Sequence, residues 1–334
     1  MTVVIPLFNG AAHIEETLTS IGDQTVGSIE VIVVDDGSTD DGAALARQHP
    51  IGATVLTQAN LGVAVARNRG LAATRTRWVA FVDQDDMWHP SHIARALVWL
   101  NAHPDERIVF LREIPFTVVD DEHALNDMDA LAGGWAHLRV SSTATLTELV
   151  ARGAVAGSDR VRRYDVRAML RGPISTTTSF IADADLLRLA GGFAPHALAM
   201  DDYWMLVNVA RLAPIPQLDQ PTVFYRVHTG ATSRTTELGL PFLSSAVALR
   251  LGGGLIPLEE GTAGRLDGDL HRHLLTELLA SQRYGDRRFR GAVDALARTL
   301  WPPDGRRVQR LRARLRARLP WLRRIRRRGR GGGS

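Results

Sequence analysis

Apolar and polar residues follow two alternating patterns along the first part of the chain. Short runs of consecutive, mostly β-branched apolar residues indicate strands buried on both faces, as in a parallel sheet. These runs lie at residues 2–6, 30–34, 53–56 and 78–82. Between them, apolar residues three or four positions apart predict helices at 14–21, 41–48 and 62–73. The alternation predicts an α/β fold with a mostly parallel, doubly wound central sheet and flanking helices.

The pattern is less regular beyond residue 90. We expect helices at 90–102, 145–152, 183–190 and 201–212, and strands at 107–119, 174–181 and 222–227. Gly191 and Gly192 suit the end of the third of these helices. Most of residues 120–172 have no clear period and are expected to form loops over a site. Beyond residue 242 the pattern is mostly helical, so we expect a first domain at 1–235, a helical C-terminal extension at 236–300 and a separate tail at 301–334.

The composition is that of a soluble globular protein: 45% of the 334 residues are apolar and 23% are charged. The absence of cysteine excludes disulfides, thiolate metal sites, iron–sulfur clusters and a cysteine nucleophile. Neither an apolar run of membrane-spanning length nor a secretory leader is found, which predicts a cytoplasmic protein.

The net charge of +4 conceals a strong asymmetry. All the basic residues are arginines, and 14 of them lie between Arg298 and the C-terminus beside a single acid, Asp304. Residues 306–328 place apolar side chains three and four positions apart with arginine in the gaps, a pattern suited to an anionic membrane surface. Peripheral binding at the inner face of the membrane is therefore one interpretation, and a solvated or partner-packed helix is the other. Nucleic acid is disfavoured because no aromatic or base-reading pattern accompanies the tail beyond Trp321.

Two acidic clusters follow predicted strands. Asp83 and Asp85 would lie on the same side of an extended segment and could converge on Mg²⁺ or Mn²⁺ and a diphosphate, with Asp86 adding to the cluster. The alternative is a turn whose acids cap the following helix. Asp36, beside Asp35, could bind a ribose or a base, and the alternative there is an Asx turn with a helix cap.

Four further residues could contribute chemistry. Asp201 and Asp202 begin a helix, where one could act as a cap and the other as a general base, although both could simply complement the helix dipole. Arg67 could point into the crevice or be solvated. His228, just beyond a strand, could contact a metal or a diphosphate, although most lone loop histidines do neither. Zinc-binding, P-loop and dinucleotide-binding motifs are missing from the sequence.

Together these motifs resemble those of family 2 glycosyltransferases, over about residues 1–235. The resemblance rests on the following residues in this order: Val3 to Asn9, Gln24, Thr25, Glu30 to Asp40, Asn60, Gly62, Arg67, Asn68, Gly70, Phe81 to Asp86, Trp88, Pro90, Gly191 to Phe193, Asp201 to Trp204, Tyr225, Arg226 and His228. It implies the A-type glycosyltransferase fold and an inverting, metal-assisted transfer from a nucleotide sugar, in the first place a UDP-sugar. The implied acceptor is a hydroxyl of a sugar, a lipid-linked sugar or a small molecule, in polysaccharide, glycolipid or secondary-metabolite glycosylation.

The resemblance also implies roles for individual residues. Asp202 matches the catalytic base, and Asp85 and His228 match metal contacts. The donor would be bound by Pro6, Phe8, Asn9, Asp36, Arg67, Asp83 and Gln84. Supporting roles fall to Asp86, Asp201, Trp204 and Arg226, with Asp201 standing where a glutamate is often found. Two alternatives stay open: a non-catalytic nucleotide-sugar-binding module, and a nucleotidyltransferase, which would normally carry a glycine-rich basic first loop that this chain lacks.

Overall fold

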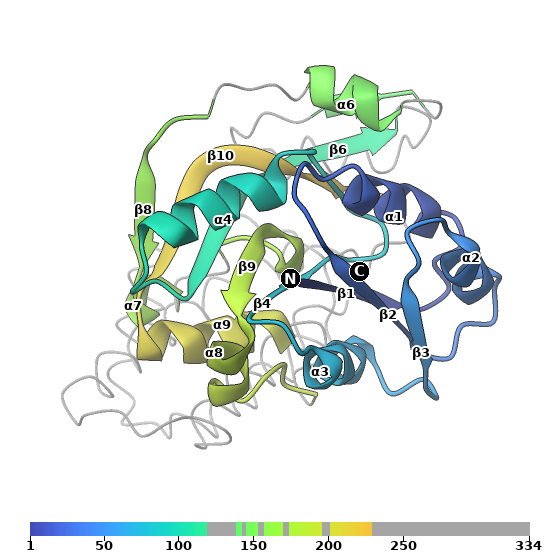
Figure 1. The fold of residues 1–334 in the computed structure, drawn as a ribbon, viewed down its shortest axis with the longest axis horizontal. Coiled ribbons are helices and arrows are strands. Elements are labelled where there is room, and N and C mark those ends of the chain that lie inside the picture. The colour runs from blue at the N-terminus through green and yellow to red at the C-terminus, as the bar shows by residue number, and fades with distance from the viewer. Residues whose placement is uncertain (119–137, 142–144, 153–156, 170–173, 196–200, 229–334) are drawn as a thin grey trace, which may run out of the picture. The chain divides into compact units, whose positions relative to one another are not determined.

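The computed structural model describes residues 1–118, 138–141, 145–152, 157–169, 174–195 and 201–228. These residues form one mixed sheet with helices on both faces (Figure 1). The predicted α/β class with a mostly parallel central sheet is confirmed. The expected helical extension at 236–300 and the arginine-rich tail at 301–334 lie outside the described residues, as does most of the expected loop region at 120–172.

The N-terminal half of the sheet is entirely parallel. Its strands are β1 (Thr2–Leu7), β2 (Glu30–Asp35), β3 (Thr54–Thr57) and β4 (Trp78–Phe81). They lie in the order β3, β2, β1, β4, with β1 paired on both sides. The strand order therefore reverses between β1 and β4, and doubly wound folds bind ligands at such a point, outside the carboxyl ends of the strands.

The second half combines both strand directions. Its strands are β5 (Met87–Trp88), β6 (Ile108–Val118), β7 (Leu138–Val140), β8 (Val161–Tyr164), β9 (Phe180–Asp183) and β10 (Ile215–Arg226). β9 lies between β4 and β6 and is antiparallel to both, whereas β10 runs parallel to β6. The carboxyl ends of β4, β6 and β10 therefore share one edge with the amino end of β9, so the turn before β9 also reaches this edge.

Helices cover the sheet on two sides. They are α1 (Ile14–Gly22), α2 (Gly42–Gln48), α3 (Val63–Ala73), α4 (His92–Ala102), α6 (Leu146–Arg152), α7 (Val166–Met169), α8 (Ala184–Leu189) and α9 (Asp201–Leu212). α1, α2 and α4 share one apolar core, with α3, α8 and α9 on the other side of the strands (Figure 1).

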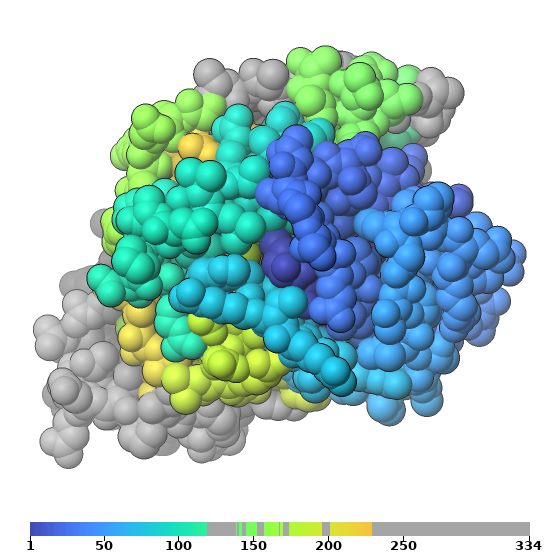
Figure 2. All heavy atoms as spheres, in the orientation of Figure 1, coloured from blue at the N-terminus to red at the C-terminus, as the bar shows by residue number. Residues whose placement is uncertain are grey.

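The spacing of apolar residues in the sequence explains this core. Ile14, Leu18 and Ile21 line one face of α1 and are fully buried, which contributes about 1.5–3 kcal/mol for each side chain. In the space-filling view only a small part of β1 is visible between its neighbours (Figure 2), and Val3 and Ile5 have no exposed surface.

The expected strand at 174–181 is wrong over residues 174–179. Thr177–Ser179 form a 3₁₀ turn, and the strand begins only at Phe180. Glu113 on β6 is the physical reason, because its Oε1 accepts hydrogen bonds from the Ser175 hydroxyl at 2.7 Å, the Ser179 hydroxyl at 2.6 Å and the Thr176 amide. These bonds bend the chain away from an extended course.

The expected end of α8 is confirmed. Gly191 and Gly192 have φ values of 93° and 68°, which favour glycine, and their amides bond to the carbonyls of Arg188 and Leu187.

Candidate active site

The acidic residues after β4 form a tight turn at the carboxyl edge of the sheet. The amide of Asp86 donates to the carbonyl of Asp83 at 3.1 Å, and the Thr17 hydroxyl on α1 donates to the carbonyls of Gln84 and Asp86, each at 2.9 Å. The expectation of an extended segment is therefore wrong, because these bonds fold residues 83–86. The alternative interpretation, that the acids cap the next helix, is also wrong, since Ser91 is the N-cap residue of α4 and the Ile93 amide in its first turn donates to the Gln24 side chain at 3.0 Å.

Arg67 joins this turn to the start of α9. Its Nη2 lies 2.5 Å from Asp83 Oδ1, and its Nη1 lies 2.8 Å from Asp201 Oδ2. The guanidinium is buried and packs over the Phe193 ring at 5.5 Å, so the alternative of a solvated arginine is excluded. Burial alone would lower the pKa of Arg67, but Asp83 and Asp201 raise it, and the side chain stays charged.

Asp202 lies beside this ion pair. Its Oδ2 accepts from the Thr177 hydroxyl at 2.8 Å, and its Oδ1 accepts from the Tyr203 amide at 2.6 Å. Burial and the neighbouring charge of Asp201 raise the pKa of Asp202 to about 6, against the opposing effects of Arg67 and Thr177. A carboxylate with a pKa in this range can accept a proton near neutral pH.

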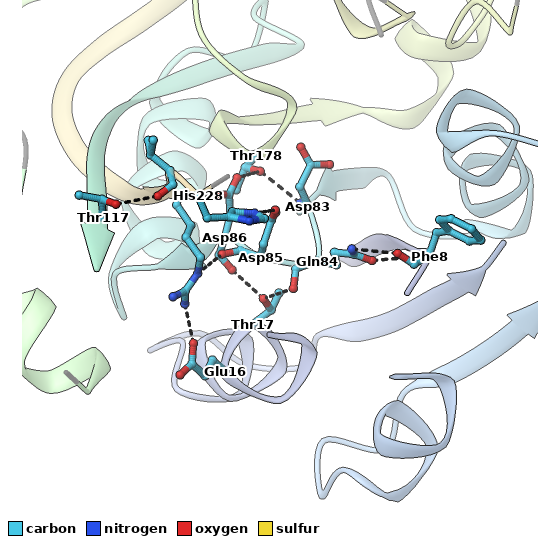
Figure 3. Close-up of polar contacts among 12 residues, drawn as sticks. Phe8, Glu16, Thr17, Asp83, Gln84, Asp85, Asp86, Thr117, Thr178 and His228 are labelled. Atoms are coloured by element: carbon cyan, nitrogen blue, oxygen red, sulfur yellow. Dashed lines mark hydrogen bonds and ion pairs between the residues drawn. The ribbon is translucent and has the colours of Figure 1, made fainter. Parts of the chain in front are cut away.

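Asp85 and His228 form an acid–histidine contact at this edge of the sheet. Asp85 Oδ2 and His228 Nε2 are 2.9 Å apart, and the two side chains are 22% and 26% exposed (Figure 3). An oxygen and a nitrogen donor so close together suit a divalent cation that takes its other ligands from water and phosphate. Within the described part of the chain, no group of three His, Asp or Glu side chains could hold a metal by itself. Asp85 and His228 could supply two of the ligands of such a cation.

Asp86 and Arg226 hold the turn at residues 83–86 in place. Asp86 is 1% exposed, and its carboxylate accepts from the Thr178 hydroxyl at 2.6 Å and the Arg226 amide at 2.9 Å. Burial raises the pKa of Asp86 well above its usual range. The buried Arg226 side chain donates to the Asp85 carbonyl at 2.9 Å and contacts Glu16 at 2.5 Å. Both residues fasten the Asp85 backbone to β10 and α1.

The residues expected to bind the donor near β1 differ in their contacts. Pro6 lies inside β1, opposite Val34, whereas Phe8 follows the strand and is 43% exposed. The side chain of Gln84 accepts from the Phe8 backbone amide at 2.8 Å and donates to the Phe8 carbonyl at 3.1 Å. These two bonds join β1 to β4 at the point of strand reversal. Asn9 has a left-handed backbone with φ 49°, and its side chain accepts from the Thr39 amide.

Asp36 is buried and fully engaged by the protein. Its two oxygens accept from the amides of Leu61 and Gly62, at 2.9 and 2.8 Å, and from the Gln58 side chain at 2.8 Å. Asp36 thus holds the segment that enters α3. Its neighbour Asp35 accepts from the Ser38 amide at 2.9 Å, a local bond to the backbone three residues further along the chain.

Trp204 is the last of the expected site residues, and three further residues at the site were not expected. Trp204 is buried on α9, and its indole N–H has no hydrogen-bond partner within the described ranges. Sequence reasoning missed Thr177, Thr178 and Glu113. The run of threonines before β9 was the available signal, but their acidic partners are distant in sequence.

Doubly wound α/β folds bind ligands where the strand order reverses, and in this sheet the acidic turn after β4 lies at that point. Among solved structures, the chain resembles S. aureus TarS (residues 1–349) in complex with UDP-GlcNAc, with a TM-score of 0.55 and 19% identity over 82% of this chain and 71% of that one. It also resembles the mannosyltransferase PcManGT from Pyrobaculum calidifontis in complex with GDP-Man and Mn²⁺, with a TM-score of 0.55 and 20% identity over 96% of this chain and 81% of that one. These likenesses confirm the A-type glycosyltransferase fold.

The sequence comparisons agree with the resemblance of the motifs. Residues 2–145 match the model of glycosyl transferase family 2. It is 37% identical over 94 residues to the uncharacterized glycosyltransferase YibD of Escherichia coli (strain K12), covering 27% of each chain. It is 36% identical over 105 residues to the putative teichuronic acid biosynthesis glycosyltransferase TuaG of Bacillus subtilis (strain 168), covering 30% of this chain and 41% of TuaG.

None of the helices in the described ranges is long and apolar enough to cross a membrane.

Proposed function

We propose that the protein is an inverting glycosyltransferase that moves a sugar from a nucleotide sugar to an acceptor hydroxyl. The observation that carries this proposal is the Arg67 bridge. By bonding to both Asp83 and Asp201, Arg67 holds the acidic turn after β4 next to the start of α9. Asp202, with a pKa of about 6, therefore lies at the same edge of the sheet as Asp85 and His228.

Asp202 is the proposed general base. With a pKa of about 6 it is roughly nine-tenths ionised at pH 7 and still basic enough to accept a proton. The acceptor hydroxyl has a high pKa and must lose its proton as it attacks the anomeric carbon. One displacement assisted by one base inverts the anomeric centre and needs no carboxylate nucleophile, in contrast to retaining glycosidases.

Asp85 and His228 are the residues proposed to hold a divalent cation, Mn²⁺ or Mg²⁺. Such a cation, when bound, neutralises charge that develops on the leaving nucleoside diphosphate. Asp85 is suited to this role because the Arg226 side chain binds its carbonyl oxygen and leaves its carboxylate facing His228. The proposal accords with the Mn²⁺ in the PcManGT structure.

The donor is proposed to be a UDP-sugar that contacts Phe8, Asp83 and neighbouring residues at the strand-reversal point. TarS was solved with UDP-GlcNAc and PcManGT with GDP-Man, so both nucleotide classes belong in the test. The match to TuaG supports a role in cell-surface polysaccharide synthesis.

The family match disfavours the nucleotidyltransferase alternative. A module that only binds nucleotide sugars would not need a carboxylate whose pKa is raised to about 6, as that of Asp202 is.

The arginine-rich segment at 306–328 supports a second part of the proposal, peripheral binding to an anionic membrane from the cytoplasmic side. Its arginines and regularly spaced apolar residues suit such a surface. Membrane binding would bring the active site to a lipid-linked acceptor.

Replacing the base tests the proposal. Asp202→Asn is expected to lower nucleoside diphosphate release from the donor, with water as acceptor, by at least about 100-fold. The donor dissociation constant measured by calorimetry should stay within about twofold, because the hydrogen bonds of Asp202 in the described residues go to Thr177 and Tyr203 and not to a residue assigned to the donor. Asp159→Asn, an exposed acid, is the matched control and should release diphosphate normally. Wild-type turnover in Asp202→Asn would refute the assignment.

A further inference from the structure

The turn before β9 connects the two halves of the site. It comprises residues 175–179 and reaches the carboxyl edge because β9 is antiparallel to β4 and β6. Two consecutive threonines of this turn have buried side chains that bond to different acids. Thr177 donates to Asp202 at 2.8 Å, and Thr178 donates to Asp86 at 2.6 Å.

The far side of the turn is anchored to the sheet. One oxygen of Glu113 accepts from the hydroxyls of Ser175 and Ser179 and from the Thr176 amide. The carbonyl of Thr178 accepts from the Trp88 indole at 2.9 Å. With four bonds holding its ends, the turn gives the Thr177 hydroxyl little freedom to move away from Asp202.

Thr177 also restricts the orientation of the Asp202 carboxylate. The Tyr203 amide occupies Oδ1 and the Thr177 hydroxyl occupies Oδ2. Each oxygen can accept a second hydrogen bond, so the carboxylate keeps a defined direction for one more donor. An acceptor hydroxyl that approaches Asp202 would meet a carboxylate that cannot rotate without breaking both bonds.

We propose that Thr177 is a positioning residue for the transfer reaction, and that its hydroxyl orients the Asp202 carboxylate and stabilises its ionised form. This inference rests on the proposed function, in which Asp202 is the base. The charged groups that face Asp202 are Asp201 on the same helix and Arg67 on α3, with Asp83 behind Arg67. Substitution of Thr177 leaves all three in place, so a change in pH dependence would report on the hydroxyl itself.

The test is the pH dependence of kcat for nucleoside diphosphate release, with water as acceptor and Mn²⁺ present. Thr177→Val keeps the shape of the side chain and removes the donor. The acid limb of the kcat–pH profile of Thr177→Val should move to higher pH by about one unit. The reason is that a hydrogen bond to a charged carboxylate favours its ionised form by about that amount. The KM for the donor should not change. Thr177→Ser restores a hydroxyl and should return the acid limb close to its wild-type position.

Thr176→Val is the matched control in the same turn. Among the described residues, the hydrogen-bond partner of the Thr176 hydroxyl is the Ser179 hydroxyl, at 3.4 Å, so this variant should keep the wild-type pH profile. Circular dichroism establishes that each variant is folded before its profile is compared. An unshifted acid limb in folded Thr177→Val, or a shift that Thr177→Ser does not reverse, would overturn the role of Thr177.

The two proposals fail in different ways. If Asp202→Asn retains wild-type turnover, the base assignment itself is wrong. If Asp202→Asn is inactive and Thr177→Val behaves like the wild type, only the further inference is wrong.

Discussion

At the scale of single residues, the carboxylates of the edge fall into two groups. Asp36 and Asp86 are buried, and backbone amides and side-chain donors of the protein already bind their oxygens. Asp85 and Asp202 are partly exposed and keep capacity for a further partner. Buried polar groups of the first kind hold the fold together, since an unsatisfied one costs about 1–3 kcal/mol. The second kind is available for chemistry.

Arg67 is the residue whose loss should be most damaging to stability. Arg67→Met would leave Asp83 and Asp201 without their cation, and breaking a buried ion pair costs about 3–5 kcal/mol. Arg77→Met is the control, because Arg77 is 61% exposed and lies 3.4 Å from Asp183, a surface pair worth at most about 1 kcal/mol. Urea denaturation measures both losses. Equal losses in the two variants would contradict the central place given to Arg67.

At the scale of elements, Asp183 joins the end of β9 to the start of α8. Asp183 ends β9 and caps α8 by accepting from the amides of Asp185 and Leu186, and it also pairs with Arg107 at 2.9 Å. Burial raises the pKa of Asp183, but the bonds from Arg107 and the two amides outweigh it, so the pKa is lowered below the ordinary value of 3.8. Asp183 therefore contributes stability as an ionised group.

The sign of this shift gives a pH prediction. The pKa of Asp183 is lower in the folded state than in the unfolded state. Its carboxylate therefore contributes its full stability above the unfolded-state pKa, and this stability is lost as the pH falls through the folded-state pKa. Asn also caps helices well, so Asp183→Asn removes the charge and keeps the cap. It should cost about 1 kcal/mol at pH 7 and progressively less below about pH 4. Thermal unfolding across this range is the measurement, with the 80% exposed Asp185 changed to Asn as control. A loss that does not depend on pH would contradict the assignment.

The sequence predicted the elements that local pattern determines. β1, β2 and β4 were found because continuous apolar runs are typical of buried parallel strands, and α1 because Ile14 and Leu18 are spaced for one helix face. It missed β8, whose sequence Val-Arg-Arg-Tyr does not alternate and whose strand form depends on pairing with β10. It also mistook residues 174–179 for strand, since Glu113, which bends them, lies far away along the chain.

The same limit applies to the site. The acids after β4 and at the start of α9 could be found from the sequence because each cluster is local. That Arg67 joins the two clusters could not, since its contacts with Asp83 and Asp201 are made only in the folded chain. The roles proposed for Asp36 and Asn9 in donor binding stay predictions, and in this structure both residues bond to neighbouring loops.

At the scale of the whole molecule, one continuous sheet carries the candidate site, and a basic tail is proposed to locate it. The prediction is that full-length protein sediments with vesicles containing anionic lipid, and that a chain lacking residues 306–334 does not, because the arginines supply the attraction. Neutral vesicles are the control and should sediment neither protein. Equal sedimentation of both proteins with anionic vesicles would exclude the tail as the membrane contact.

The central claim is that this edge of the sheet binds a nucleotide sugar through a divalent cation and activates it. The most direct measurement is a thermal-shift and diphosphate-release panel of UDP-, GDP- and dTDP-sugars with Mn²⁺, Mg²⁺ or EDTA, on the wild type, Asp85→Ala and the exposed control Asp105→Ala. We predict stabilisation and release with one nucleotide class in the wild type and the control, because a ligand bound only to the native state raises its apparent stability. EDTA and Asp85→Ala should each abolish both effects. Metal-independent stabilisation that survives in Asp85→Ala, or the absence of any shift or release with all donors, would contradict the account.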